Sequence, residues 1–451
     1  MAVGGLLPLV AGTPAIADDT ELFLIGPDPN NQPKANVLFI LDTSFSMTTT
    51  QDTNKPYENT DTYAGDCDPT KFYWTDVDIT PDCATTGNVI DASAYLCEFS
   101  DKQIAGIGSF TNTMVQYRDG GADGNTGSTD KSWQYLAPGY ASAPVECLAD
   151  SGKHGDGVDL TRLWPAGGTN LVEPFTNDAT ESVSWGSAPR NRSYTVYSGN
   201  YLNWKANPET VTLSRSDIMK EVTRKVLSSV SNLNVGLMRF VGEDGGSIIL
   251  DIQDLDTNRQ TVVDAVSTLP ADGETPLSET LYEAALFWTG QVADYGAAAR
   301  TALSDPNVFV PGSSPETYEQ PGWDACVKNY NVLLSDGDPR SDTDTPELLA
   351  NLPEWATTMG STTCDGDVTE DGACLDDVGK YLSIRDIDPV TDGDQFVTTH
   401  TIGFVNNIAS LEETAADSGG QYFLANDVES LTQTLLSIIA NINDRSLSFS
   451  A

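Results

Sequence analysis

A short stretch near the start of the chain places three oxygen-bearing side chains directly after an apolar run. Residues 37–41 are all apolar, and Asp42, Ser44 and Ser46 follow at alternate positions. Such a run is typical of a parallel strand buried on both faces, and in open α/β sheets ligands bind beyond the carboxyl ends of the strands. One carboxylate and two hydroxyls suit a hard divalent cation such as Mg²⁺. Alone, the same spacing is also typical of an ordinary turn after a strand.

Two later stretches strengthen the prediction of a metal site. Thr275 stands directly before a predicted helix, with Pro276 at its first position. Asp336 follows a second apolar strand and precedes a glycine turn. Each stretch thus adds one oxygen-bearing side chain that could contribute to a metal site.

The order of these three segments resembles the von Willebrand factor A domain. The resemblance implies an α/β fold with a doubly wound, mostly parallel sheet and a metal ion-dependent adhesion site (MIDAS). Ser44, Ser46 and Thr275 would then offer hydroxyl oxygens, and Asp42 and Asp336 would hold the ion directly or through water. The ion would be Mg²⁺, with Mn²⁺ or Ca²⁺ as alternatives, and one open position would take a partner's carboxylate. The alternative is a scaffold that keeps these loops only as turns.

The first loop departs from the family pattern at Phe45, where a glycine is usual. Glycine tolerates strained backbone angles and leaves a site open, whereas phenylalanine does neither. Two interpretations remain: Phe45 lies exposed at the rim as a partner contact, or it alters the loop and weakens metal binding.

Composition excludes several classes of function. The chain has 66 acidic and 23 basic residues, a formal charge of −43, which repels nucleic acid and anionic membranes. No nucleophile elbow, Walker loop or histidine pair is present, so we do not expect an enzyme. We interpret the two histidines, His154 and His400, as surface or packing residues. Several Asp-rich loops, including residues 365–371, are either calcium sites or solvated turns.

Terminal and cysteine patterns predict export. Residues 1–17 resemble the later part of a secretory signal, and residues 18–35 form an amino-terminal extension. Seven cysteines fit an oxidising compartment. We expect a disulfide between Cys364 and Cys374, which leaves Cys326 unassigned. Four further cysteines allow two bridges in any of three connectivities: Cys67, Cys83, Cys97 and Cys147.

Alternating strands and helices predict one A-like domain over residues 36–445 that contains a large disulfide-bearing insertion. The inserted subdomain spans residues 48–213, and an acidic loop insertion spans residues 337–395. Helices are predicted at 217–230, 257–269, 276–295, 375–384, 409–417 and 428–442. Further strands are predicted at 234–241, 247–252, 396–404 and 421–424.

A narrower resemblance covers the chain from about Asp18 to its end. The segments 195–227, 234–240, 272–284, 326–339, 376–382 and 396–404 are similar to the amino-terminal half of the PilY/PilC family, exported proteins associated with type IV pili. The resemblance implies type IV pilins or minor pilins, and a host or abiotic surface ligand, as partners. It also implies that the family's carboxyl-terminal propeller is missing from this chain, which we expect to be a fragment.

We therefore expect a cell-surface module at the pilus tip or outer membrane that acts in adhesion and surface sensing. The insertion would offer an aromatic contact face with Tyr197, Tyr201 and Trp204, unless these side chains merely pack the insertion onto the sheet. Its disulfides would also suit a strain-bearing element in mechanosensing. The alternative function is a metal-independent structural subunit that primes assembly of the fimbrium.

Overall fold

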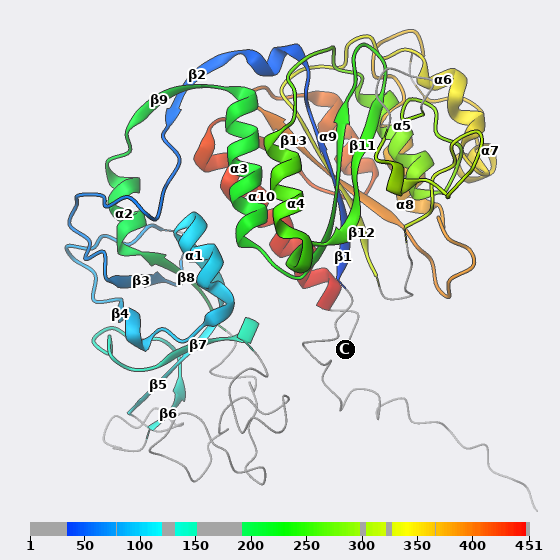
Figure 1. Ribbon diagram of the computed structural model, residues 1–451. Helices are drawn as coiled ribbons and strands as arrows, with labels where there is room; N and C mark the ends of the chain where they lie inside the picture. Colours follow the sequence, from blue (N-terminus) through cyan, green and yellow to red (C-terminus); the bar gives the residue numbers. More distant parts are fainter. Residues whose placement is uncertain are drawn as a thin grey trace, which may run out of the picture.

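The structure is a computed structural model that describes residues 34–77, 79–119, 131–150, 192–297, 304–321, 327–365 and 367–447. The predicted signal and most of the extension, together with Cys326 and His154, lie outside these residues. Two units lie side by side (Figure 1). One is built on the strand that ends at Asp42, and the other is the segment inserted after it.

A six-stranded sheet forms the centre of the first unit, in the order β11-β10-β1-β12-β13-β14. Four neighbouring pairs are parallel, and β11 pairs antiparallel with β10 at one edge. The strands are β1 (Ala35–Leu41), β10 (Leu233–Phe240), β11 (Gly246–Asp254), β12 (Asn329–Ser335), β13 (Val397–Phe404) and β14 (Tyr422–Ala425). The expected mostly parallel α/β sheet is therefore present.

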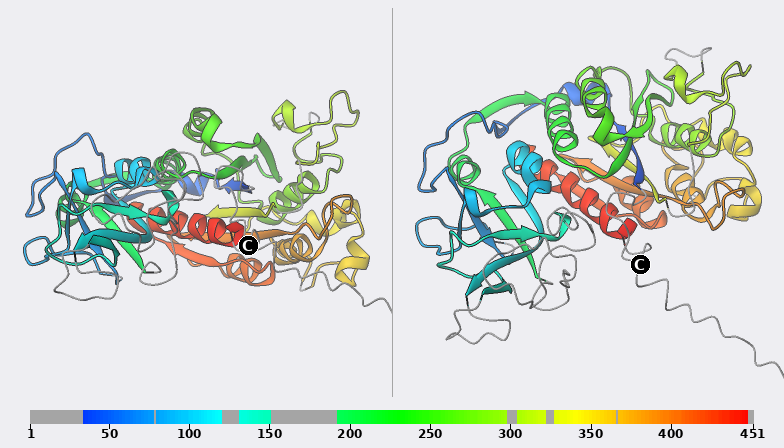
Figure 2. Two further views of the ribbon diagram at one scale, coloured as in Figure 1. Left: turned by 90° about the horizontal axis from the view of Figure 1, so that it is seen from below. Right: turned by 60° about the horizontal axis from the view of Figure 1, so that its bottom comes forward.

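Helices cover both faces of this sheet (Figures 1 and 2). Alternate residues of β1 enter two separate cores, because successive side chains of a strand point to opposite faces. Val37, Phe39 and Leu41 pack with α3 (Arg215–Ser229), α4 (Leu255–Ser267) and α10 (Val428–Leu447), whereas Leu38 and Ile40 pack with α5 (Leu277–Trp288) and its neighbours. Burial on both faces therefore explains the uninterrupted apolar run, as predicted.

All six predicted helices are present. They are α3 (Arg215–Ser229), α4 (Leu255–Ser267), α5 (Leu277–Trp288), α8 (Leu375–Ile384), α9 (Ala409–Asp417) and α10 (Val428–Leu447). The prediction for α5 was wrong at both ends. Pro276 is the N-cap rather than the first helical residue, and the helix stops before Gly290, whose φ of 66° lies in the left-handed region.

The inserted segment forms a second sheet, in the order β4-β3-β8-β5-β6, with β7 also paired to β5. Its strands are β3 (Lys71–Thr75), β4 (Val89–Asp91), β5 (Ser109–Asp119), β6 (Lys131–Gln134), β7 (Val145–Cys147) and β8 (Ser193–Ser198), and its helices are α1 (Asp101–Ile107) and α2 (Gly199–Ala206). The disulfides Cys67–Cys83 and Cys97–Cys147 settle the connectivity that the sequence left open.

A two-stranded ribbon connects the insertion to the first unit. The outgoing strand β2 (Thr50–Asn54) pairs antiparallel with the returning strand β9 (Thr210–Ser214), so that Thr50 lies opposite Ser214. The two ends of the insertion are therefore neighbours, next to the turn that follows β1.

The insertion contains an aromatic cluster of its own. Tyr57, Tyr201 and Trp204 form one buried cluster, in which Tyr201 and Trp204 are each 3% exposed. Tyr197 is half-buried and packs against this cluster. Of the two alternatives, the contact face is wrong for Tyr201 and Trp204, because both side chains are buried among aromatic residues of the insertion itself.

The acidic segment 337–395 carries more regular structure than its composition predicts. It contains α6 (Thr345–Leu348), α7 (Trp355–Met359) and α8, and Trp355 is buried in the core that contains α5. The expected disulfide Cys364–Cys374 is present just before α8. Among the described residues, no helix combines the length and apolarity needed to cross a membrane.

Candidate metal centre

The polar loops after β1 and β12 lie side by side at the carboxyl ends of these neighbouring parallel strands. Leu41 pairs with Leu334, and the Asp42 amide donates a hydrogen bond to the Leu334 carbonyl at 3.1 Å. Asp42, Ser44 and Asp336 are all buried. Sheet register alone therefore brings together two carboxylates that lie 294 residues apart.

Hydrogen bonds connect four of the five predicted ligands. The Ser44 and Ser46 Oγ atoms are 2.7 Å apart, and Ser46 Oγ donates to Asp336 Oδ1 at 2.5 Å. Asp42 accepts from the Ser44 amide at 2.7 Å and from Ser335 Oγ at 2.6 Å. Because Ser46 gives its proton to the carboxylate, lone pairs on its oxygen stay available to a cation.

Thr275 lies on a loop that is fastened to the first one. The Phe45 amide donates to the Gly273 carbonyl at 2.8 Å, and the Asp272 amide donates to the Thr43 carbonyl at 2.7 Å. Gly273 has a φ of 95°, and a Cβ there would lie 2.3 Å from the Gly242 carbonyl oxygen, so this close approach requires glycine. Thr275 is buried, but within the described chain no hydrogen bond joins its hydroxyl to the other four side chains.

Phe45 occupies an unstrained position at the rim. It begins a short 3₁₀ turn, Phe45–Thr48, and is absent from the described non-glycine residues with positive φ. Its side chain is 71% exposed. Of the two interpretations left open by the sequence, the structure agrees with an exposed side chain, and the backbone does not need glycine here.

The charges of Asp42 and Asp336 favour the binding of a cation. Burial raises the pKa of Asp42 to about 6, and repulsion from Asp336 adds to that rise. Asp336 forms an ion pair with Arg215, whose Nη1 lies 2.8 Å from Oδ2. No described Lys or Arg forms an ion pair with Asp42. Buried carboxylates with adjacent hydroxyls and too little countercharge are a donor set that fits a hard divalent cation.

Asp342, which the sequence did not single out, connects the segment after β12 to the start of α5. Asp342 accepts hydrogen bonds from the Ser278 and Glu279 amides at the start of α5, at 2.7 and 2.9 Å, and from Ser278 Oγ at 2.7 Å. It thus caps a helix whose own N-cap, Pro276, has no side-chain acceptor. Burial next to Asp342 raises the pKa of Glu279 to about 8. This cap holds the helix that follows Thr275.

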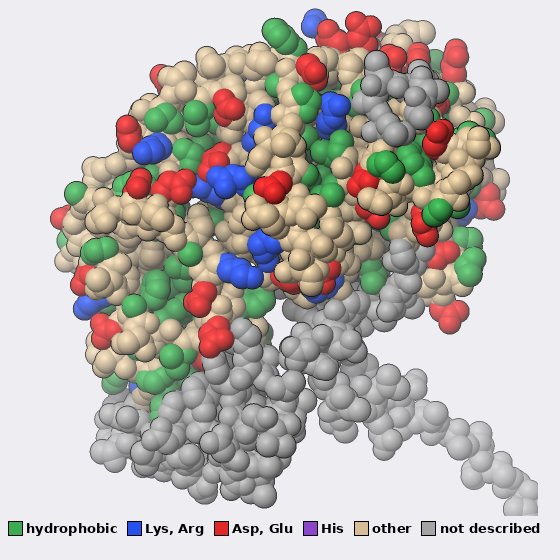
Figure 3. Space-filling view, in the orientation of Figure 1, with side chains coloured by type: hydrophobic (Ala, Val, Ile, Leu, Met, Phe, Trp, Pro, Cys, Tyr) green, Lys and Arg blue, Asp and Glu red, His purple; other side chains and the backbone are tan. Residues whose placement is uncertain are grey.

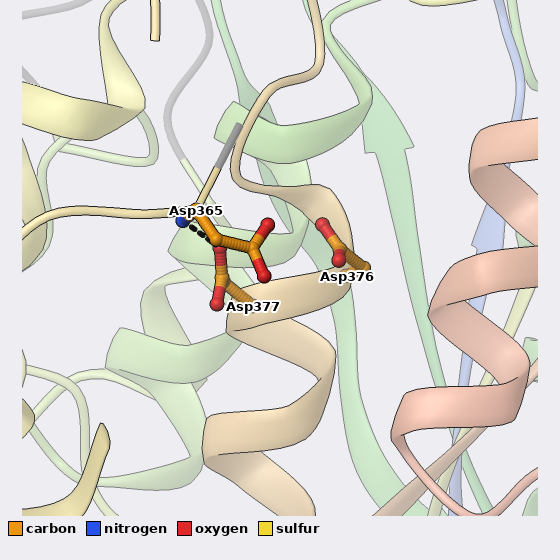
Figure 4. Close-up of side chains that lie close together, drawn as sticks. All are labelled: Asp365, Asp376 and Asp377. Atoms are coloured by element: carbon orange, nitrogen blue, oxygen red, sulfur yellow. Dashed lines mark hydrogen bonds between the residues drawn. The ribbon is translucent and has the colours of Figure 1, made fainter. Parts of the chain in front are cut away.

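A second carboxylate cluster lies near α8 (Figure 4). Ligand oxygens of Asp365, Asp376 and Asp377 lie within 4.8 Å of one another. Asp377 accepts a hydrogen bond from the Asp365 amide at 2.8 Å, and Asp365 is exposed. Residues 365–371, considered from sequence as one calcium loop, do not converge, since Asp367 accepts from Thr369 and Asp371 from the Asp342 amide.

His400 lies in the sheet, away from the solvent. His400 is fully buried in β13, where its ring stacks on Tyr330 and its Nδ1 accepts from the Gln421 amide at 3.1 Å. This placement agrees with the interpretation of His400 as a packing residue.

Comparisons with known proteins give only distant likenesses. No family model and no curated protein sequence matches the chain. Among solved structures, the PilB minor pilin from Streptococcus sanguinis is 12% identical, with 75% of this chain and 77% of that chain covered and a TM-score of 0.28. The vWF domain of the type V pili tip protein Mfa5 from Porphyromonas gingivalis is 10% identical, with 51% of this chain and 88% of that chain covered and a TM-score of 0.29.

A third solved structure was determined with an ion. Proximal thread matrix protein 1 from the mussel byssus, with a zinc-occupied MIDAS motif, is 10% identical over 52% of this chain and 41% of that chain, with a TM-score of 0.27. All three TM-scores lie below 0.5, so we base no conclusion on these likenesses.

Proposed function

We propose that this chain is an exported adhesin and surface-sensing module of the type IV pilus tip, built on a von Willebrand factor A-like domain. A divalent cation, Mg²⁺ in the first place, would be held by Asp42, Ser44, Ser46, Thr275 and Asp336. Bound there, the cation would supply positive charge and an open position for a partner's carboxylate oxygen. The pilus assignment rests on the sequence resemblance to the PilY/PilC family.

One observation supports the metal site most strongly. Two segments far apart in the sequence bring hydrogen-bonded carboxylates and hydroxyls to one edge of the sheet, and backbone hydrogen bonds fasten the loop before Thr275 to the first of them. The strand order, with one antiparallel edge strand beside β10, supports the A-like fold. Convergence of this kind is hard to explain by turns alone, because a turn needs donors only for its own backbone.

Exposed groups near the site are the proposed partner contacts. Phe45 lies between Ser44 and Ser46 in the same loop and is exposed, and aromatic residues are enriched at protein interfaces. Tyr201 and Trp204 are left out of this surface. Pilins or minor pilins and a host or abiotic ligand are the proposed partners.

Calorimetric titration of Mg²⁺, Mn²⁺ and Ca²⁺ into the metal-stripped protein tests the site. We expect one site in the wild type and a loss of affinity of about 100-fold or more in Asp42→Ala, since even outer-shell partners are worth 10- to 100-fold. Asp376→Asn is the matched control: it removes one negative charge from the second cluster and should leave affinity unchanged. Equal binding in Asp42→Ala would contradict the proposal.

The second candidate function is a structural tip subunit that primes pilus assembly without an ion. Its support is that Arg215 already supplies one positive charge to Asp336. Pilus number and adhesion in cells carrying Asp42→Ala distinguish the two functions. The metal-dependent function predicts that adhesion is lost, whereas the structural function predicts no change in either quantity.

A further inference from the structure

Arg215 was not expected at the site, yet its side chain lies against one of the proposed ligands. It is the first residue of α3, directly after β9, and its Nη1 donates to Asp336 Oδ2 at 2.8 Å. The Arg215 side chain is 16% exposed and that of Asp336 is fully buried. The helix is rich in cations, and Lys and Arg side chains gather in the middle of the face in Figure 3, where Figure 1 places α3 and α4.

This ion pair is incomplete from the side of the arginine. A guanidinium has five N–H donors, but Nε of Arg215 is buried without a hydrogen-bond partner. The contact with Asp336 is made by one nitrogen to one oxygen, not by a two-bond fork. A buried donor left unsatisfied costs free energy, so the arginine is held in place by charge rather than by a complete set of hydrogen bonds.

Among the described residues, one of the two carboxylates of the site has an ion-pair partner and the other has none. Asp336 has Arg215 as its ion-pair partner, whereas Asp42 relies on neutral donors from Ser44, Ser335 and the Asp336 amide. A divalent cation bound between the loops would satisfy both carboxylates, and it would repel a guanidinium that remained on Asp336. Ion and arginine therefore bind the same carboxylate with opposing effects.

We propose that Arg215 is a built-in counter-ion that occupies Asp336 in the metal-free protein and must give way when the divalent cation binds. The inference rests on the proposed metal site and assigns to Arg215 the setting of its affinity. In the metal-free state the guanidinium stabilises the buried Asp336. In the metal-bound state it opposes the ion, so both effects weaken metal binding.

The position of Arg215 also connects the site to the insertion. Its backbone amide donates to the Thr49 carbonyl at 2.9 Å, next to the paired residues Thr50 and Ser214. The Ser214 side chain caps α3 by accepting from the Asp217 amide at 3.0 Å. When metal binding displaces the Arg215 guanidinium from Asp336, the change therefore occurs where the ribbon β2–β9 joins the first unit.

Titration of Mn²⁺ into full-length variants of this chain tests the role of Arg215. Arg215→Gln removes the charge and should bind Mn²⁺ about tenfold more tightly or better, because unit charges a few ångströms apart interact strongly at a partly buried site. Arg215→Lys keeps the charge and can replace a single-nitrogen contact, so its affinity should stay within about threefold of the wild type. Arg224→Gln is the matched control, because Arg224 is on the same helix and pairs with Glu221 instead.

Thermal unfolding supplies a second readout. Metal-free Arg215→Gln should melt below the wild type, because Asp336 loses its partner, and Mn²⁺ should raise its melting temperature by more than it raises that of the wild type. If Arg215→Gln binds Mn²⁺ no more tightly than the wild type, or more weakly, the inference is wrong while the metal site stands. If only Arg215→Gln binds, the inference is supported. If no variant binds, the metal site itself is absent and the inference falls with it.

Discussion

The molecule has two carboxylate clusters, and they differ in how they are built. The first joins two buried carboxylates to hydroxyls from separate loops, beside one arginine. The second consists of carboxylates alone, drawn from one short segment next to a disulfide, and ranges from exposed to buried. In a chain of charge −43, carboxylates meet often without a ligand. The number of carboxylates is thus a poorer sign of a cation site than burial, mixed donors and convergence of distant segments.

After the loss of Asp42 itself, the largest effect should come from removing a hydroxyl in the first cluster. Ser46→Ala deletes the oxygen that lies between Ser44 and Asp336, and we expect Mg²⁺ affinity to fall by about 100-fold. Thr48→Ala is the control, since its exposed hydroxyl bonds only to the Phe45 carbonyl. Calorimetry measures both. Similar losses in the two variants would mean that the loop as a whole, rather than the ligand oxygen, determines affinity.

The free energy of unfolding of the metal-free protein should depend strongly on pH because of Asp42. Burial raises the pKa of Asp42 to about 6, above the ordinary value near 4, so the folded state holds this proton more tightly than the unfolded chain does. The stability from this group is present below about pH 4 and is lost as the pH rises to about 6. Relative to Asp42→Asn, the free energy of unfolding should fall by up to about 3 kcal/mol between pH 4 and pH 7.

Urea unfolding of both proteins in a chelator measures this difference. Saturating Mg²⁺ should abolish it, because the ion takes the place of the proton. A wild type and an Asp42→Asn variant with parallel pH profiles would show that Asp42 is already compensated without metal.

Breaking the disulfide beside the second cluster should separate stability from metal binding. The bond closes a short loop, with a separation of 10 residues between Cys364 and Cys374. Replacing both cysteines by serine should lower the free energy of unfolding by about 2 kcal/mol and leave Mg²⁺ affinity unchanged. Chemical denaturation and calorimetry test the two parts. A large fall in affinity would show that the two clusters are coupled.

The smallest effect should come from the second cluster itself. Burial, with repulsion from Asp377 and Asp365, raises the pKa of Asp376 to about 6. This side chain is partly exposed, so water screens it, and Asp376→Asn should change stability by less than about 1 kcal/mol over the same pH range. Differential scanning calorimetry at pH 4 and pH 7 measures the change. A shift as large as that for Asp42→Asn would remove the contrast between the clusters.

The sequence was informative where one local pattern had one structural cause. The run before Asp42 predicted a doubly buried strand because a short apolar run rich in β-branched and aromatic residues is typical of one. The resemblance to the A domain then implied that Asp336 would lie beside Asp42. The Cys364–Cys374 pair was predictable from its short spacing.

What the sequence concealed depended on contacts between distant segments. In the sequence, Arg215 looks like an ordinary first residue of a helix. Only the packing of α3 over the site brings it to Asp336. Asp342 reads as one acid among many, although it caps α5. The sequence left open whether Tyr201 and Trp204 are exposed or packed, because aromatic residues in a polar segment carry no sign of what they pack against.

The ribbon β2–β9 has a mechanical consequence. Both strands leave the first unit at Thr50 and Ser214 and reach the insertion together at Asn54 and Thr210. A pull on the insertion loads the two strands in parallel, along covalent bonds, and neither shears nor unzips the hydrogen bonds between them. The contacts that yield first are those across the junction, such as the ion pairs Lys225–Glu58 and Lys205–Glu429. Under tension the insertion would swing outward on an intact tether.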